Sequence, residues 1–406
     1  MSRELLERLA RRGMTPGLER IRDLLARLDH PERAFRVVLV GGTNGKGSTA
    51  RALARILQAS GERVGLFTSP HLLDVRERIE VNAAAIAPEA LDDLLVRLAP
   101  RLEAGGASYF EALAAAALVH FAEQGVTTAV LEVGLGGRFD AVNAADPVLS
   151  IITNVALDHT DWLGPTLAHV AREKAGILRP GRPALTAATG AGADFLAAAA
   201  RARGARLERV APSHVEVHGY GVAFALGGGV YAAPLMGRHQ AANLALAVRA
   251  ARELGADEAA VRAGLAAVRH PGRLEYRPAE RLLLDGAHNP AGARALARAL
   301  ADYFPAGPKI LVFAASRDKD ASGMAAALAP AFEAVWLTRY PGARAADPAA
   351  LARFFPAARV EPDPQVALER ALEARPPGGL VVAAGSLYLL GALMRERAGF
   401  PAEPPR

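Results

Sequence analysis

An apolar, β-branched run that leads into a glycine-rich loop constrains this chain more than any other feature. Residues 36–40 (RVVLV) are typical of a buried strand, and the next nine residues (GGTNGKGST) contain four glycines and Lys46. A helical pattern runs from Ala50 to Ser60 and stops at Gly61. A strand, a glycine-rich turn and a helix in this order present backbone N–H groups and a positive helix end to an anion. The segment therefore predicts a nucleotide phosphate site in which Lys46 reaches a terminal phosphate.

The loop is a variant of the usual phosphate-loop motif, G-x-x-x-x-G-K-[ST]. Val40 stands where the first glycine would be, and Gly47 separates Lys46 from Ser48, so the hydroxyl that faces Mg²⁺ is displaced by one residue. A flexible connection between strand and helix is the alternative interpretation. The motif leaves kinases, motor ATPases and ligases open, while the absence of a guanine-reading N-K-x-D sequence weakens a GTPase.

Strand and helix patterns alternate along the first half of the chain. Two amphipathic helices are expected at 2–12 and 17–28, strands at 64–68, 127–133 and 149–153, and helices at 89–98, 110–124 and 166–178. This alternation is typical of βα units around a mostly parallel sheet. The glycine-rich residues 205–237 predict a small β-meander, and two further helices are expected at 240–254 and 257–268.

The pattern restarts after His270-Pro271-Gly272-Arg273, which reads as an interdomain linker. Four strand patterns (282–285, 310–315, 334–337 and 379–384) each precede a helical stretch. We therefore expect an α/β protein with two domains. Residues 1–272 would form a P-loop ATPase-type doubly wound sheet with the β-meander, and residues 273–406 a smaller Rossmann-like α/β domain.

Lysine is rare in this chain, because only four of the 48 basic residues are lysines. Each lysine therefore raises the question of what an ammonium does that a guanidinium cannot, with residual codon usage as the alternative. Lys174 lies near the end of an expected helix, where a solvated lysine would be favoured by the helix dipole. An amine of lowered pKa could instead act as a nucleophile or become carbamylated, which arginine cannot.

Composition excludes several classes of function. The chain has no cysteine, so thiolate zinc sites, iron–sulfur ligation, thiol catalysis and disulfides are ruled out. Its net charge of +6 comes from arginines interleaved with Asp and Glu, which does not indicate a nucleic-acid partner. No apolar run approaches the roughly 18 residues of a membrane span, and the N-terminus has no signal-peptide core. We expect a cytoplasmic protein with neither a nucleic-acid nor a membrane partner.

Three polar residues follow expected strands and form a candidate metal site. Ser69, Glu132 and His159 each lie at or beyond the carboxyl end of a strand, where the ligand crevice of a doubly wound sheet forms. Mg²⁺ prefers hard oxygen ligands, whereas a histidine is an unusual ligand for it. The alternatives are a turn hydroxyl at Ser69, a buried ion pair at Glu132 and a helix-start cap at Asp158 and His159.

Ten segments in order along the chain extend the interpretation. They are GTNGKGST (42–49), TSPHLLDVRERI (68–79), SYFEALAAAAL (108–118), LEVGLGGRFDAVN (131–143), LDHTDWLGPT (157–166), REKAGI (172–177), HQAANLALA (239–247), HPGRLE (270–275), LDGAHNP (284–290) and GSLYLLG (385–391). Together they strongly resemble the folylpolyglutamate synthase/dihydrofolate synthase family, within the Mur-ligase superfamily of ATP-dependent amide ligases. The segments LGGRxDxxN, DHxxxLG with REKAGI, and DGAHNP are far more specific than a phosphate loop.

The resemblance implies a role for particular residues. ATP phosphates would be held by Thr43, Asn44, Gly45, Lys46, Gly47 and Ser48, with Asn243, Arg273 and Asp285 completing the nucleotide site from the domain junction. Mg²⁺, with two ions expected, would be bound by Ser69, Glu132 and His159, and Lys174 would be carbamylated to support the metal site. His288 would lie near ATP and glutamate. Dihydropteroate would be bound by Ser108, Tyr109, Phe110, Glu111, Arg138, Phe139 and Asp140. The rings of Tyr109 and Phe110 could equally be core residues at a helix start.

The family implies an acyl-phosphate reaction. ATP would convert a carboxylate of dihydropteroate or of a reduced folate to an acyl phosphate, and the amine of L-glutamate would then displace phosphate to form an amide. Catalysis would fall on Lys46, Lys174 and His288, in a monomer whose domains close on the substrates. Dihydrofolate synthesis, polyglutamate extension and both together are open, with LGGRFDAVN and SYFE resembling the bifunctional bacterial form. A peptidoglycan Mur ligase is one alternative, although only 40 residues precede the phosphate loop; the other is a nucleotide-gated ATPase or binding protein without ligation.

Overall fold

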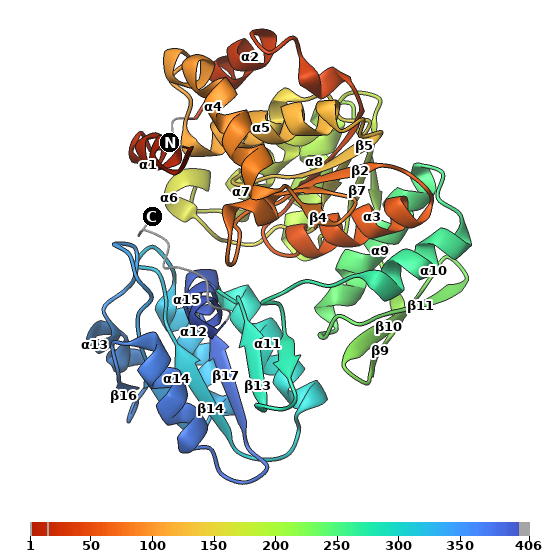
Figure 1. Ribbon diagram of the computed structural model, residues 1–406. Helices are drawn as coiled ribbons and strands as arrows, with labels where there is room; N and C mark the ends of the chain where they lie inside the picture. Colours follow the sequence, from red (N-terminus) through yellow and green to blue (C-terminus); the bar gives the residue numbers. More distant parts are fainter. Residues whose placement is uncertain (1, 14–15, 398–406) are drawn as a thin grey trace. The chain divides into compact units, whose positions relative to one another are not determined.

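The computed structural model describes residues 2–13 and 16–397. The chain forms two compact units, each with its own mostly parallel sheet, which confirms the expected α/β class (Figure 1). The first unit contains residues 1–213, 226–231 and 242–268, and the second contains residues 214–225, 232–241 and 269–406. The domain limits expected from the sequence, 1–272 and 273–406, stay a prediction.

The first sheet has eight strands in the order β4-β3-β2-β5-β1-β6-β7-β8. Six are parallel: β1 (Arg36–Gly41), β2 (Val64–Phe67), β5 (Thr128–Glu132), β6 (Leu149–Ile152), β7 (Pro183–Thr186) and β8 (Arg206–Arg209). Two antiparallel strands, β3 (Ile79–Val81) and β4 (Ala84–Ala85), extend the edge beside β2. Strand β1 is central, so its carboxyl end lies between those of β5 and β6.

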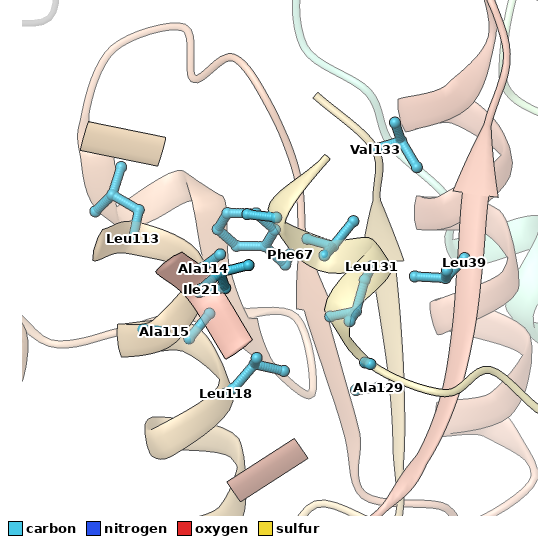
Figure 2. Close-up of a cluster of buried hydrophobic side chains, with 14 of the residues drawn as sticks. Ile21, Leu39, Phe67, Leu113, Ala114, Ala115, Leu118, Ala129, Leu131 and Val133 are labelled. Carbon is cyan, nitrogen blue, oxygen red and sulfur yellow. The ribbon is translucent and has the colours of Figure 1, made fainter. Parts of the chain in front are cut away.

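Alternating side chains of β1 divide the first unit into two layers. Val37 and Leu39 belong to a core that includes Ile21 and the alanine-rich face of α5. Figure 2 shows Leu39, Ile21 and Ala114 of this core. The small side chains of α5 let this helix lie close to the sheet. Val38 and Val40 are buried on the opposite face, where helix α3 contacts β1, β2 and β5.

The helices of the first unit carry the following bounds: α1 (Ser2–Arg11), α2 (Glu19–Ala26), α3 (Lys46–Ala59), α4 (Pro88–Ala104), α5 (Tyr109–Glu123), α6 (Thr160–Leu163), α7 (Leu167–Lys174), α8 (Gly190–Ala202) and α10 (Glu258–Ala267). Helix α9 (His239–Glu253) begins in the second unit and continues in the first. Short 3₁₀ turns are η1 (Pro31–Arg33), η2 (Val75–Arg78), η3 (Ala141–Ala144) and η4 (Ala175–Ile177).

Two helix boundaries differ from the sequence expectation. Helix α3 begins at Lys46 and not at Ala50, because Gly45 adopts a left-handed φ of 84° and turns the chain directly into the helix. The helix expected at 166–178 ends at Lys174 and continues as the 3₁₀ turn η4. At that point the backbone of Gly176 lies against Arg138, where a Cβ on Gly176 would be 2.3 Å from the Arg138 Cα.

The glycine-rich region forms the expected small meander. Its three strands are β9 (Ser213–His218), β10 (Gly221–Leu226) and β11 (Gly229–Ala233), in the order β11-β10-β9. Within the second unit the hydroxyl of Tyr303 donates to the Gly221 carbonyl at 2.6 Å and accepts from the Gly237 N–H at 3.0 Å. These bonds explain why parts of the meander belong to the second unit.

The second sheet has the order β12-β13-β17-β14-β15-β16. Its strands are β12 (Glu275–Arg277), β13 (Leu282–Asp285), β14 (Lys309–Phe313), β15 (Ala334–Leu337), β16 (Arg359–Val360) and β17 (Leu380–Ala384), and all but β12 are parallel. The helices are α11 (Pro290–Tyr303), α12 (Ala321–Leu328), α13 (Pro348–Leu351), α14 (Pro364–Glu373) and α15 (Leu387–Arg397), with turns η5 (Ala329–Ala331) and η6 (Ala352–Phe354). Leu296 of α11 and Met324 of α12 pack with Leu311 and Phe313 in the core. None of the helices in the described part of the chain is long and apolar enough to span a membrane.

Candidate active site

The glycine-rich loop after β1 is fastened to the segment that follows β6. The N–H of Thr43 donates to the Asn154 carbonyl at 3.1 Å, and the Thr43 hydroxyl exchanges hydrogen bonds with the backbone of Ala156 at 3.0 Å. The side chains of Thr153 and Asn154 donate to the Asn44 carbonyl at 2.6 Å and 3.1 Å. These contacts within its own unit fix the backbone of the loop, as a preformed anion site requires.

Two glycines of the loop cannot carry a side chain. Gly42 has a φ of 140°, and a Cβ there would lie 1.8 Å from the Thr153 hydroxyl oxygen. Gly45 has a φ of 84°, and a Cβ there would lie 2.2 Å from Oδ1 of Asn243. Asn243 thus lies against the loop, and its carbonyl accepts from the Thr49 hydroxyl at 3.3 Å.

Lys46 is half-buried at the first position of α3, and its Nζ donates to the Thr43 carbonyl at 3.2 Å. The lysine is folded back over its own loop. In this position its ammonium and the N-terminus of α3 contribute positive charge to the same small region.

Glu132 ends β5 directly beside the phosphate loop. It is paired in register with Val40, its side chain is buried, and its Oε2 accepts from the Ser69 N–H at 3.1 Å. The structure therefore brings Ser69 and Glu132 together, as the sequence predicts for two of the three metal-binding candidates. Both supply hard oxygen atoms, which suit Mg²⁺.

Lys174 is buried at the end of α7, with 3% of its surface exposed. Burial and, to a smaller extent, the positive charge of Lys46 lower the pKa of its amine to about 7, while Asp158 and Glu173 oppose the shift. A substantial fraction of this amine is neutral at physiological pH. The sequence leaves two alternatives for Lys174, a solvated lysine at a helix end and an amine of lowered pKa. Its burial excludes the solvated lysine.

His159 is the N-cap residue that precedes α6, and it adopts a left-handed conformation with a φ of 50°. Its N–H donates to Oδ1 of Asp158 at 2.9 Å, and its Nε2 lies 3.9 Å from the same oxygen. Across residues 2–13 and 16–397, no three His, Asp or Glu side chains gather as a metal site. Metal binding by His159 stays a prediction.

Ser108 and Glu111 close a capping box at the start of α5. The Ser108 hydroxyl accepts from the Glu111 N–H at 3.4 Å, and Oε2 of Glu111 accepts from the Ser108 N–H at 2.8 Å. The buried Glu111 also accepts from Nη2 of Arg20 at 3.1 Å. These contacts stabilise the helix start, and substrate binding by the two side chains stays a prediction.

The two aromatic residues at the same helix start, Tyr109 and Phe110, contact different kinds of side chain. The Phe110 ring packs against Phe67 with centroids 5.6 Å apart, as the core alternative expects. The Arg78 guanidinium lies 5.6 Å from the centroid of the Tyr109 ring, and Nε of Arg78 donates to Nδ1 of the buried His71 at 2.8 Å. No local pattern around His71 or Arg78 indicates this pair of buried polar residues.

The loop after β5 exposes Arg138 and Phe139 and buries Asp140. Phe139 is 44% exposed, and the Arg138 guanidinium lies 4.7 Å from the centroid of its ring. Asp140 accepts from the N–H groups of Leu135 at 2.9 Å and Val142 at 3.1 Å. Burial raises the pKa of Asp140 to about 6, although these bonds and the charge of Lys46 oppose the shift.

Within the second unit, Asp285 and Arg273 lie in one local cluster at the carboxyl end of β13. Oδ2 of Asp285 accepts from the Leu274 N–H and Oδ1 from the Ala287 N–H, both at 2.9 Å. Burial raises the pKa of Asp285, while the charge of Arg273 and the two backbone bonds lower it. Nδ1 of His288 donates to the Gly286 carbonyl at 2.8 Å, and Arg273 donates to the same carbonyl at 3.2 Å.

Both units match known families. Residues 40–251 match the Mur ligase middle domain, and residues 272–387 match the glutamate ligase domain of Mur ligases. A folylpolyglutamate synthase of Lacticaseibacillus casei is 36% identical over 416 residues, which cover 97% of this chain and 96% of that protein. This chain belongs to the folylpolyglutamate synthase/dihydrofolate synthase family of Mur ligases.

Other members of the family differ in length or have been solved with ligands. A probable bifunctional folylpolyglutamate synthase/dihydropteroate synthase of Halobacterium salinarum is 39% identical over 94% of this chain, and the chain spans about half of that relative's length. The structure of Escherichia coli FolC in complex with DHPP and ADP has a TM-score of 0.88 and 30% identity, covering 98% of this chain and 97% of that one. A bifunctional family enzyme with Mn, AMPPNP and L-glutamate bound has a TM-score of 0.83 and 33% identity, covering 95% of each chain.

Some residues that hold the phosphate loop are not among those that the sequence singles out. In the segment after β6 the sequence singles out His159, yet Thr153, Asn154 and Ala156 hold the phosphate loop. A signal was present, because hydroxyl and amide side chains directly follow a buried strand that is expected next to the loop. No comparable signal marked Arg20, which lies 91 residues from Glu111.

Proposed function

We propose that this chain is an ATP-dependent ligase that adds L-glutamate to dihydropteroate, to the glutamate tail of a reduced folate, or to both. The observation that carries the proposal is a preformed phosphate loop with Lys46, flanked by buried Glu132 and Lys174, in a chain of this family. The E. coli relative with DHPP and ADP and the family enzyme with AMPPNP and L-glutamate support the same three classes of substrate.

Phosphoryl transfer between two anions requires positive charge at the phosphates. Thr43 to Ser48 would bind the phosphates, and Lys46 would place its ammonium at the terminal phosphate. A carboxylate oxygen of the acceptor then attacks the γ-phosphorus, and ADP leaves. The glutamate amine attacks the resulting acyl carbon and loses a proton, and phosphate departs with the former carboxylate oxygen.

Oxygen atoms of Ser69 and Glu132 fit a divalent cation beside this loop, with His159 as a third candidate. Because Mg²⁺ binds few protein ligands and keeps water and phosphate oxygens, the buried Glu132 and the half-buried Ser69 are a sufficient anchor. The bound cation would neutralise charge on the phosphates. Manganese in the solved relative supports a divalent-metal site.

Lys174 suits carbamylation because a neutral amine can add to carbon dioxide, which a protonated amine cannot. Burial and the lowered pKa keep part of the amine neutral, and Lys46 lies close enough to lower the pKa of Lys174. Carbamylation would convert a repelling cation into an anion near Lys46, so that the two lysines attract each other. We propose this modification as the way in which Lys174 supports the cation site.

The remaining predicted residues divide between acceptor and nucleotide. The exposed Arg138 and Phe139 offer a cation and a ring to an aromatic acid, while Tyr109 offers a second ring. Asn243 beside the phosphate loop, and Arg273 with Asp285 in the second unit, would contact the nucleotide. His288 would contact ATP or glutamate. A monomeric state and a cytoplasmic location stay predictions of the sequence.

The dependence of ADP release on the substrates tests the proposal. We expect the purified protein to release ADP only when MgATP, L-glutamate and either dihydropteroate or tetrahydrofolate are all present. Comparing turnover on the two acceptors decides between the two synthase activities. ADP release without glutamate or acceptor would instead support a nucleotide-gated ATPase, and a requirement for a nucleotide-sugar peptide would support a peptidoglycan ligase.

A further inference from the structure

Asn143 lies at the centre of a buried junction between the loop that exposes Arg138 and the turn that follows Lys174. It is 3% exposed in the 3₁₀ turn η3. Its Nδ2 donates to the Arg138 carbonyl at 3.0 Å and to the Gly176 carbonyl at 3.2 Å. One side-chain amide therefore joins the two segments.

Arg179 fixes the orientation of that amide. Its Nη2 donates to Oδ1 of Asn143 at 3.0 Å, to the Asn143 carbonyl at 3.1 Å and to the Ala145 carbonyl at 3.1 Å. Because Oδ1 accepts from a guanidinium, Nδ2 of the same amide must face the two carbonyl groups. A charged donor makes this orientation more stable than a neutral contact would.

The backbones on both sides of Asn143 are in direct contact. The Arg138 N–H donates to the Glu173 carbonyl at 2.9 Å. A Cβ on Gly137 would lie 2.9 Å from the same carbonyl oxygen, and a Cβ on Gly176 would lie 2.3 Å from the Arg138 Cα. The Arg138 backbone is thus bonded at both its N–H and its carbonyl, while its side chain is exposed.

We propose that Asn143, oriented by Arg179, is a positioning residue that holds the acceptor-binding loop and the Lys174 segment as one rigid piece. The pinned backbone presents the Arg138 guanidinium and the Phe139 ring at a fixed place, although both side chains are open to solvent. The same amide fixes the carbonyl of Gly176, two residues beyond Lys174. This inference rests on the proposed function, because it assigns the acceptor to Arg138 and Phe139.

An isosteric substitution tests the role. In Asn143→Asp an oxygen replaces Nδ2 and faces the carbonyls of Arg138 and Gly176, while the other oxygen still accepts from Arg179. We expect the KM for the acceptor to rise by about tenfold and kcat to fall, with the KM for ATP changed less than about twofold. The variant Arg179→Lys, which cannot hold the amide in the same way, should raise the acceptor KM in the same direction by a smaller factor.

Ser150→Ala is the matched control. The buried Ser150 hydroxyl donates to the Ile177 carbonyl at 2.8 Å, so its loss removes a hydrogen bond to the same turn without touching Arg138. We expect Ser150→Ala to lower the melting temperature and leave the acceptor KM unchanged. A role of Asn143 in stability alone would give Asn143→Asp this same result, and would overturn the inference.

A double-mutant cycle measures whether Asn143 affects the acceptor KM through Arg138. If Asn143 acts through Arg138, adding Asn143→Asp to Arg138→Ala should raise the acceptor KM by less than about twofold beyond Arg138→Ala alone. Two fully multiplying effects would overturn the inference. Wild-type protein that makes no amide from glutamate and acceptor would instead refute the proposed function, so the two failures are distinguishable.

Discussion

The loop after β1 and the loop after β13 occupy the same place at the carboxyl ends of their sheets, yet their chemistry is opposite. After β1 the N–H groups of Thr43 and Asn44 donate to the neutral residue Asn154, and Lys46 adds a cation. After β13 two backbone N–H groups are used by Asp285, a carboxylate built into the strand end. The first loop is suited to bind an anion, and the second holds one of its own.

This difference teaches that parallel-sheet topology provides a place for a ligand but does not choose the ligand. A few residues decide which ligand each loop can bind. Gly42 and Gly45 keep side chains out of the loop after β1, whereas the buried carboxylate of Asp285 occupies the loop after β13. Changing those residues should therefore alter function without changing the fold, and the following experiments are ordered by expected effect.

Removing the cation of the first loop should have the largest effect. We expect Lys46→Ala to lower kcat by about a hundred- to a thousandfold, because transition-state charge loses its nearest ammonium. Circular dichroism should show a folded protein. Lys309→Ala is the control, since Nζ of Lys309 donates only locally to the Gly307 carbonyl at the start of β14. Full activity of Lys46→Ala would refute the phosphate assignment.

Lys174 tests whether the first loop also needs a modifiable amine. We expect Lys174→Arg to lose about ten- to a hundredfold in kcat, because a guanidinium cannot be carbamylated. Lys174→Ala should lose activity as well and regain part of it with small carboxylic acids, which replace the carbamate. Normal turnover of Lys174→Arg would contradict the carbamate proposal.

A comparison of two glycines separates the cost of backbone strain from the cost of a steric clash with Asn243. Gly45 and Gly61 have similar φ values, 84° and 88°, but only at Gly45 would a Cβ meet another group, Oδ1 of Asn243. We expect Gly61→Ala to lower the free energy of unfolding by about 1 kcal/mol from strain alone. Gly45→Ala should cost about 1–3 kcal/mol more and weaken ATP binding. Equal losses in denaturant titrations would show that Asn243 does not restrict the loop.

The pH dependence of stability has the smallest expected effect on catalysis. The Lys174 pKa is lowered from its ordinary value of 10.5 to about 7, so between these values the unfolded chain binds more protons. Its contribution to stability therefore rises with pH from about 7 to 10.5, and the full penalty of a buried cation is present below pH 7. In buffer free of carbon dioxide, Lys174→Met should melt above wild type at pH 6, with a gain that shrinks toward pH 10. Lys309→Met should show no such trend; a pH-independent gain for Lys174→Met would argue against a buried cation.

The sequence predicted the elements that local patterns specify. The strand at 36–40 and the loop after it were recognisable because apolar β-branched residues and glycines have local conformational preferences. The start of α3 at Lys46 was missed, since it depends on the left-handed Gly45 and not on helix propensity. Strand β8 lies within the region that the sequence predicts as the β-meander, yet it joins the parallel sheet beside β7; an exposed edge strand with the sequence RLER has no apolar pattern to show this.

The site was predictable where residue chemistry is local and not where it depends on distant contacts. The S-x-x-E pattern of Ser108 and Glu111 could have been read as a capping box, which the structure contains. The burial of Lys174 could not be read from Arg-Glu-Lys-Ala-Gly, a typical solvated helix end. Asn154 lies 110 residues from the loop that it holds, so only the sheet order brings the two together.

Transfer of an acceptor oxygen into phosphate tests the central claim most directly. Dihydropteroate or tetrahydrofolate with ¹⁸O in its reacting carboxylate would be incubated with the protein, MgATP and L-glutamate, and the released phosphate examined by mass spectrometry. An acyl-phosphate ligase must release one ¹⁸O with each phosphate and form one amide for each ADP. Phosphate that carries no ¹⁸O, with ADP released at an unchanged rate when glutamate is omitted, would contradict the account.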